Sequence, residues 1–213
     1  MPPGKLVNQK NRRRAEAESR LGAVLEVAAA LFLQRGYSHT SLNDVIARAG
    51  GSKATLLKYF GSKAGLFAAV IESVSERFVA TAHFTDLQGS PEEVLIAFGT
   101  IVLRFYLAHD SLVAYRGVSS EGYRYPSMAK AFYQQGHALV AAALALRLES
   151  WRAARQITSI DCTDDANLFL HLLRAGVYEQ VLLGVRQSAT SAEIRHRVEQ
   201  AVKIFLHGIK VRS

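Results

Sequence analysis

Apolar residues recur every three or four positions through almost the whole chain, the spacing that places them on one face of an α-helix. The pattern is clearest over residues 21–32, which carry leucine, valine, alanine and phenylalanine at these intervals. No segment of useful length alternates apolar and polar residues as a half-buried strand would. The sequence therefore predicts an all-α fold of about nine helices.

Short polar signals divide the first third of the chain into separate helices. Gly36 ends the first, because glycine readily takes the left-handed conformation that terminates a helix. The run "SLND" at residues 41–44 is a capping-box pattern before a second helix, which Gly50-Gly51 ends. Ser52 then caps a third helix that runs through Phe60. These three short helices predict a compact head at the N-terminal side.

Longer helices follow the head. "SPEE" at residues 90–93 combines a cap, a proline at the first helical position and a capping-box glutamate. The remaining helices are expected from about Lys63 to Thr81, Ser90 to His109, Ser111 onward, Pro126 to Arg155, Thr163 to Val185, and Ser191 onward. We therefore expect a flexible basic arm (1–18), a three-helix head (19–63) and a second helical domain (64–213).

Positive charge is concentrated at the N-terminal side. Residues 1–63 hold 11 Lys and Arg against 4 Asp and Glu, whereas residues 64–213 hold 15 against 14. Nearly all of the net charge of +8 therefore lies in the first third. Such an excess suits a polyanionic partner, because each cation placed on a phosphate releases condensed counterions. A basic surface that only aids solubility is the alternative, and charge alone does not separate the two.

Several classes of protein are disfavoured by the sequence. The longest fully apolar run, Ala138 to Leu146, is far shorter than the roughly 18 residues that suggest a membrane span, and no signal-peptide pattern is present. Cys162 is the single cysteine, and the seven histidines form no H-x-x-x-H pair. "GVSSEG" at residues 117–122 lacks the G-x-S-x-G spacing of a hydrolase nucleophile. We expect a cytoplasmic protein that is not an enzyme, needs no metal or cofactor and contacts no membrane.

The third helix has an unusual outer face. On a helical wheel Leu56 and Phe60 face inward, while Ala54, Thr55, Lys58 and Tyr59 point outward. A small side chain, a hydroxyl, an ammonium and a phenol suit close approach to phosphate oxygens and base edges in a DNA groove. With the preceding helix and the glycine turn, this arrangement predicts a helix-turn-helix whose second helix enters the major groove.

The run "AAALFLQRGYSHTSLNDVIARAGGSKATLLKYFGSKAGLFAAV" resembles the DNA-binding domain of the tetracycline-repressor (TetR) family over about 45 residues. The matching positions are Phe32, Gly36-Tyr37, Thr40-Ser41, Ile46-Ala47, Ala49-Gly50, Ser52, Thr55-Leu56, Tyr59-Phe60 and Ser62-Lys63. The resemblance implies a dimeric, ligand-responsive transcriptional regulator, usually a repressor of a palindromic operator. One departure is Leu57, where the family most often has a tyrosine that touches the DNA backbone.

Site residues follow from the resemblance by position. Thr40, Thr55, Tyr59 and Lys63 become expected phosphate contacts, and Lys53, Ala54 and Lys58 become groove-facing positions. The predicted DNA surface also includes Ser52 and the basic arm residues Arg12, Arg13 and Arg14.

The second domain resembles the ligand and dimerisation region of the family, and in particular the regulatory domains of its AcrR-like branch. There the last two helices pair with those of a second subunit, and their apolar stripes support this: Leu168, Leu172, Val181, Leu182, Ile194, Val198, Val202, Phe205 and Ile209. These residues could instead complete the core of one subunit. Aromatic residues concentrated in this domain could line an apolar pocket or serve as core packing. The predicted ligand-binding residues are Phe98, Tyr106, Arg116, Tyr123, Trp151, Phe169 and His171.

Two other functions remain open at this stage. The chain could be a helical interaction or small-molecule-binding protein with a degenerate DNA-binding head. Leu57 supports this alternative, because it replaces the tyrosine that most often touches DNA in the family. It could also be an enzyme or carrier built around a helical pocket, although no catalytic constellation supports this.

Overall fold

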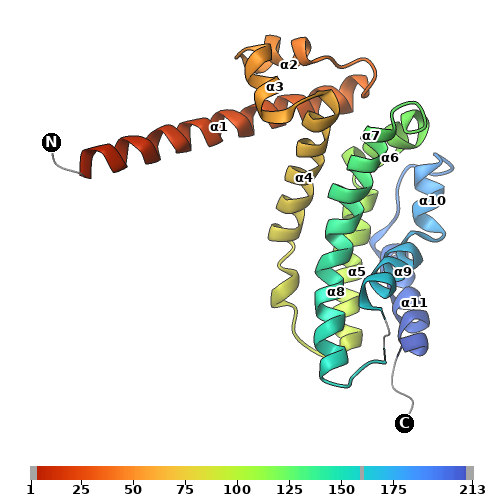
Figure 1. The fold of residues 1–213 in the computed structure, drawn as a ribbon. Coiled ribbons are helices and arrows are strands. Elements are labelled where there is room, and N and C mark those ends of the chain that lie inside the picture. Colours follow the sequence, from red (N-terminus) through yellow and green to blue (C-terminus); the bar gives the residue numbers. More distant parts are fainter. Residues whose placement is uncertain (1–3, 159–160, 210–213) are drawn as a thin grey trace.

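The protein folds into a small head on an elongated helical body (Figure 1). The computed structural model describes the backbone of residues 4–158 and 161–209 and the side chains of residues 19–158 and 161–208, so the predicted interface residue Ile209 lies outside the described side chains. All regular structure in these ranges is helical, which confirms the all-α prediction.

The head contains α1 (Gly4–Arg35), α2 (Leu42–Ala49) and α3 (Lys53–Phe60). The predicted ends are confirmed: Gly36 has a φ of 79°, and Ser41 forms a capping box with Asp44. Ser52 caps α3 by accepting a hydrogen bond from the backbone N–H of Thr55. These local signals define the helix-turn-helix formed by α2 and α3.

The turn between α2 and α3 requires glycine for its backbone conformation. Gly50 and Gly51 have φ values of 77° and 94°, which side-chain-bearing residues rarely adopt. A Cβ atom at either position would meet no atom within 4 Å. The glycines therefore set the path of the turn, and close crossing of the two helices does not depend on them.

The N-terminal arm differs from its prediction. α1 begins at Gly4, so the segment expected to be a flexible arm is helical from that residue onward. Its sequence explains the difference, because residues 5–18 are rich in Lys, Arg, Gln, Glu and Ala, all good helix formers. Arg12, Arg13 and Arg14 lie outside the residues whose side chains are described.

α4 (Lys63–Thr81) leads from the head into the body, where long helices run side by side (Figure 1). The body continues through the short turn η1 (Phe84–Asp86), α5 (Pro91–Leu107), α6 (His109–Glu121), α7 (Pro126–Ala131), a π-helical turn η2 (Phe132–His137), α8 (Ala138–Ala153), α9 (Cys162–Arg174), α10 (Val177–Leu182) and α11 (Ser191–Ile209). The count of about nine expected helices is close. The helix expected over 163–185 is divided into α9 and α10, and the one from Pro126 contains η2.

Two apolar cores hold the molecule together. One fills the body around α5, α8, α9 and α11. The other joins the head to the body, because Leu66, Phe67 and Val70 of α4 and Met128 of α7 pack with Leu31 of α1. The head therefore shares its core with body helices on the C-terminal side of residue 63, and a shift in α4 or α7 is transmitted directly to the head.

The apolar stripe of the last helices is largely internal. Val181, Ile194, Val198, Val202 and Phe205 are buried within the core of this one chain. The prediction that they form a subunit interface is therefore wrong for these five residues. α11 uses this face to pack against α5, which sequence spacing does not reveal.

In the described part of the chain, no single helix is long and apolar enough to cross a membrane. α5 and α6 meet the length and composition of a span only when taken together, across a bend of 67°.

Candidate functional site

The outer face of α3 is an exposed polar surface on a rigid support. Leu56 is buried in the head core, whereas Lys53, Ala54, Thr55 and Lys58 are exposed. Tyr59 is also exposed, with 52% of its surface accessible. The structure thus brings five of the sequence-predicted contact residues onto one surface, together with the capping hydroxyl of Ser52. Two cations, hydroxyl groups and a phenol on this surface can donate hydrogen bonds to an anionic partner.

Two neighbours extend this surface. Leu57 is 40% exposed, so it does not thicken the core of the head. Arg48, in the last turn of α2, is exposed as well and was missed from sequence. Its signal was available, because an arginine at the end of the first helix of a helix-turn-helix lies beside the second.

Thr40 does not belong to this surface. Its side chain is 1% exposed, and its hydroxyl donates to the carbonyl oxygens of Leu31 and Gly36 at 3.2 and 2.9 Å. The predicted phosphate contact by Thr40 is therefore corrected. The hydroxyl thus bonds the carbonyl of Gly36, just beyond α1, and the carbonyl of Leu31 near the end of that helix.

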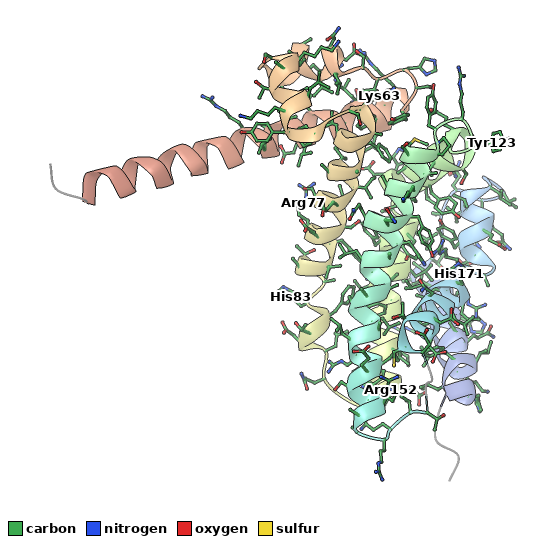
Figure 2. All side chains as sticks on the ribbon, in the orientation of Figure 1. Lys63, Arg77, His83, Tyr123, Arg152 and His171 are labelled. Carbon is green, nitrogen blue, oxygen red and sulfur yellow. The ribbon has the colours of Figure 1, made fainter. Side chains whose placement is uncertain are left out.

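Lys63 is half-buried at the junction of head and body (Figure 2). Its ammonium donates to the carbonyl oxygen of Tyr37 at 2.9 Å and lies 4.2 Å from the centre of the Tyr37 ring. Burial lowers the pKa of Lys63, and the nearby carboxylate of Glu121 works against this shift. In this structure the ammonium contacts the turn after α1, and the phosphate contact of Lys63 stays a prediction.

Glu121 connects α6 to the same turn. Its carboxylate accepts a hydrogen bond from the backbone N–H of Ser38 at 2.9 Å. The Tyr37 ring also packs edge-on against Tyr125, just beyond α6, with ring centres 5.1 Å apart. The α1–α2 turn is thus held from α4 by Lys63 and from the end of α6 by Glu121 and Tyr125.

A large cavity lies in the half of the body nearest the head. Its volume is about 860 Å³, within the range of small-molecule sites. Its wall is mainly apolar and draws on α1, α4, α5, α6, η2, α9 and α10. The wall reaches Gly36 and Tyr37 at the end of α1, so the cavity extends to the turn described above.

The predicted ligand-binding residues divide into two groups. Tyr106 and His171 line the cavity. Phe98, Trp151 and Phe169 are buried in the body core instead, and Tyr123 points fully into solvent. Arg116 is exposed and donates to the carbonyl oxygens of Val181 and Leu182, both at 2.7 Å, which ends α10. These last five residues do not reach the cavity, and their predicted role is corrected.

Two polar residues of the cavity wall, Arg174 and His137, form a hydrogen-bonded chain with Asn167 behind them. Arg174 donates to Nδ1 of His137 at 2.7 Å, so the proton of this imidazole is on Nε2, which donates to Oδ1 of Asn167 at 3.0 Å. The amide of Asn167 is oriented by its own donation to the carbonyl oxygen of Thr163. Burial, followed by the Arg174 charge, lowers the pKa of His137 to about 4. His137 is therefore a neutral acceptor that orients the guanidinium.

Tyrosines surround this guanidinium. Arg174 lies 5.1 Å from the centre of the Tyr106 ring, and the Tyr178 ring packs against that ring at a tilt, with centres 6.1 Å apart. Burial raises the pKa of Tyr106 to about 12 and that of Tyr178 to about 12, with Arg174 opposing both shifts. The Tyr106 hydroxyl is buried near Arg174 but does not meet the geometry of a hydrogen bond with any group of the described residues.

Arg174 and His137 were missed from sequence. The available signal was an arginine at the end of an otherwise apolar run, "LFLHLLR" at residues 168–174. His137 carried no such signal, because the π-helical turn η2 decides where its ring points. π-helical turns occur often at functional sites.

Comparisons with known families match both parts of the chain. Residues 24–70 match the family described as bacterial regulatory proteins, tetR family. Residues 93–208, more than half of the chain, match the C-terminal domain of AefR-like transcriptional repressors. The sequence resemblance had suggested the AcrR-like branch for this second region.

Individual relatives agree with these matches. The flavonoid-responsive regulator FrrA is 31% identical, with a TM-score of 0.74, over 92% of this chain and all of FrrA. A TetR-family transcriptional regulator from Mesorhizobium loti MAFF303099 shares the fold, with a TM-score of 0.76 at 20% identity over 91% of this chain and 98% of that one. The repressor ComR of Escherichia coli K12 is 43% identical over 58 residues, which span 27% of this chain and only 28% of ComR.

Proposed function

Because the chain belongs to the TetR family of bacterial transcriptional regulators, with a C-terminal domain of repressor type, we propose that it is a dimeric repressor that a small aromatic molecule releases from a two-fold operator. Family membership implies DNA binding and dimerisation, and the family consists of regulators rather than enzymes. The operator symmetry, the effector and the residues involved are the proposal.

The DNA-binding surface is the outer face of α3. Lys53, Thr55, Lys58 and Tyr59 are exposed there, and Leu56 anchors the helix in the head core. In a dimer two copies of α3 would each enter the major groove of one half-site, about one helical turn of DNA apart. Arg48 is close enough in sequence to the turn to add a phosphate contact beside α3.

The observation that carries the ligand response is the reach of the cavity. Its wall includes Gly36 and Tyr37, and Tyr37 in turn holds the ammonium of Lys63 at the start of α4. A molecule in the cavity therefore contacts the residues that fix the head on the body. Since α1 and α4 share one core, a displacement there would move α3 relative to its partner in the dimer.

The chemistry of the wall favours an aromatic effector. Phe105, Tyr106, Tyr115, Phe132 and Tyr178 all contribute to it. FrrA, which is similar to this chain along its whole length, is described as flavonoid-responsive, and this supports a flat aromatic molecule of comparable size. To move occupancy from almost complete to almost absent, such a molecule must bind the released state about 10⁴-fold more tightly than the DNA-bound state.

The dimer surface is the exposed side of α9 and α11. These helices pack against each other, and Leu168 and Ile204 remain 53% and 56% exposed on them. Large exposed apolar side chains on adjacent helices suit a two-fold helical interface.

The test is a fluorescence-anisotropy titration of the purified protein on DNA from its own promoter region, with and without a panel of flat aromatic compounds. We expect tight, salt-dependent binding to one two-fold site and release by at least one compound. The double charge reversal Lys53→Glu and Lys58→Glu should abolish DNA binding while leaving thermal stabilisation by the compound intact. Arg104→Glu, at an exposed position of α5 outside the head, is the control and should bind DNA normally.

The outcomes separate the rival functions. Undiminished affinity in the Lys53→Glu and Lys58→Glu variant would place the DNA surface elsewhere. Absence of any specific DNA binding, with retained binding of a compound, would favour a small-molecule-binding protein with a degenerate head. Turnover of a compound in the absence of DNA would favour an enzyme.

A further inference from the structure

The cavity contains a positive charge that the protein does not neutralise. Arg174 forms no ion pair with any Asp or Glu of the described residues. Its hydrogen bond within this part of the chain goes to the neutral ring of His137, and its Nε is buried without a partner. Arg174 as a whole is partly buried, but its Nε is removed from water, and a charged group that loses water costs free energy unless it is paired.

The other ionisable groups of the wall do not supply the missing anion. Asp110 lies at the start of α6 and is exposed to solvent. Arg77 has the same sign of charge, is 60% exposed and has Glu26 4.0 Å away. Tyr106 and Tyr178 keep their protons, since burial raises the pKa of each to about 12. His137 and His171 face each other with ring centres 5.3 Å apart and add no negative charge.

The guanidinium is also held in place. Asn167 orients His137, and His137 accepts from Arg174. His171 is held from the same residue, because its Nδ1 donates to the backbone carbonyl oxygen of Asn167 at 2.7 Å. A cation fixed in this way presents its remaining N–H groups in a constant direction, which favours recognition of one group on a ligand.

We infer that Arg174 is the anion-recognition residue of this cavity, and that the effector is an aromatic acid whose carboxylate or phenolate oxygen pairs with the guanidinium. This inference rests on the proposed function, which it deepens by naming the class of effector. The Tyr106 hydroxyl, buried beside Arg174, keeps its proton and is the second donor to that oxygen. The aromatic rings of the wall surround the apolar part of the molecule.

The test compares 2-naphthoate with its neutral analogue 2-naphthalenemethanol by isothermal titration calorimetry on the full chain. The native protein should bind the acid about tenfold or more tightly, the gain expected from a charge-assisted hydrogen bond in a site shielded from water. This comparison needs no variant. Equal or tighter binding of the neutral analogue would overturn the inference, as would binding of neither probe at millimolar concentration.

Variants locate the effect on one residue. Arg174→Met should reduce affinity for 2-naphthoate by about tenfold or more and leave affinity for 2-naphthalenemethanol within about twofold. Arg174→Lys, which keeps the charge, should retain a preference for the acid. The matched control Arg77→Met removes another arginine of the same wall and should change neither affinity by more than about twofold. An acid preference that survives in Arg174→Met or disappears in Arg77→Met would assign the site to a different residue and overturn the inference.

The nature of the acid is decided by a third probe, 4-nitrophenol, titrated on both sides of its own pKa. Tighter binding of the ionised form shows that a phenolate is accepted as well as a carboxylate. His137, Tyr106 and Tyr178 do not titrate between pH 6 and 8.5, because the pKa of His137 is about 4 and those of Tyr106 and Tyr178 are about 12. Titration of 2-naphthalenemethanol over the same pH range controls for the other groups of the wall. An affinity that does not follow ionisation of the phenol, in a protein that prefers 2-naphthoate, would restrict the site to carboxylates and refute the phenolate part of the inference.

Failure of this inference is distinguishable from failure of the proposed function. If the acid binds through Arg174 but does not release DNA, the ligand-responsive repressor is wrong and the anion site remains. If neutral aromatic compounds alone release DNA, the repressor remains and the anion site is wrong.

Discussion

A substitution of Lys63 tests whether its ammonium stabilises the fold or binds a DNA phosphate. Replacement by methionine keeps the aliphatic stem and removes the ammonium. Because the ammonium is already bonded to the Tyr37 carbonyl at 2.9 Å and lies over its ring at 4.2 Å, we expect Lys63→Met to destabilise the fold rather than weaken phosphate binding.

The size of this effect follows from the contacts. A hydrogen bond from a charged donor is worth about 1.5–3 kcal/mol, and a partly buried cation–π contact adds about 0.5–2 kcal/mol. Two terms work against them: burial of the ammonium, which lowers the pKa of Lys63, and the N–H of Thr40, which still donates to the Tyr37 oxygen at 3.3 Å after the substitution. A net loss of about 1–2 kcal/mol lowers Tm by about 2–8 °C for a chain of this size.

The assay pairs calorimetry with the salt dependence of operator binding. Each phosphate contact contributes about 0.9 to the slope of log K against log salt, or about 1.8 for the two subunits of a dimer. Lys58→Met, at an exposed position of α3, is the comparison: it should lower the slope by about 1.8 and leave Tm unchanged. Lys63→Met should lower Tm and leave the slope unchanged. A slope that falls by about 1.8 in Lys63→Met, with an unchanged Tm, would refute the internal role and return Lys63 to the DNA surface.

The other predictions concern single contacts of the head, the cavity and the subunit surface. Thr40→Val removes a buried hydroxyl and should cost about 1–2 kcal/mol in denaturant unfolding, whereas Thr40→Ser should cost less; equal stability of Thr40→Val and the native chain would contradict the buried hydrogen bonds. The pKa of His137 is lowered to about 4 in the folded protein. Between about pH 6.5 and pH 4 the unfolded chain therefore binds a proton that the folded chain does not, and the free energy of unfolding should decrease as the pH is lowered through this window. His137→Gln should lose less stability than the native chain between pH 7 and pH 4.5, and an identical loss would show that His137 does not contribute. Leu168→Asp combined with Ile204→Asp should give monomers by light scattering with unchanged helical content, and a persistent dimer would move the interface elsewhere. Leu57→Tyr should leave operator affinity within about threefold if Lys58 and Arg48 already supply the phosphate contacts, and a large gain would show that Leu57 is a defect in the DNA surface.

Local signals in the sequence were sufficient for the ends of the helices. Ser41 with Asp44, and Ser90 with Glu93, cap their helices through atoms only three residues apart, so no knowledge of the fold is needed. The outer face of α3 was equally accessible, because a two-turn helix with Leu56 inward leaves little choice for the remaining side chains.

The side-chain orientations that the sequence did not predict depend on long-range contacts. Thr40 and Lys63 have side chains typical of a DNA surface, and only the packing of the α1–α2 turn against α4 and α6 directs both inward. The same limit applied to the cavity. Phe98 and Tyr106 lie on one helix about 80° apart, which is enough to place the first in the core and the second in the cavity wall.

The π-helical turn at residues 132–137 has a consequence for evolutionary comparison. Such a turn accommodates one residue more than an α-helical turn, and one residue corresponds to about 100° of rotation around the axis. An ungapped alignment with a homologue that lacks the extra residue would pair positions about 100° apart around the helix beyond the turn. Effector preference in this lineage could therefore be re-tuned by a single codon insertion or deletion near Gly136, which would rephase a whole helix face without changing any other amino acid.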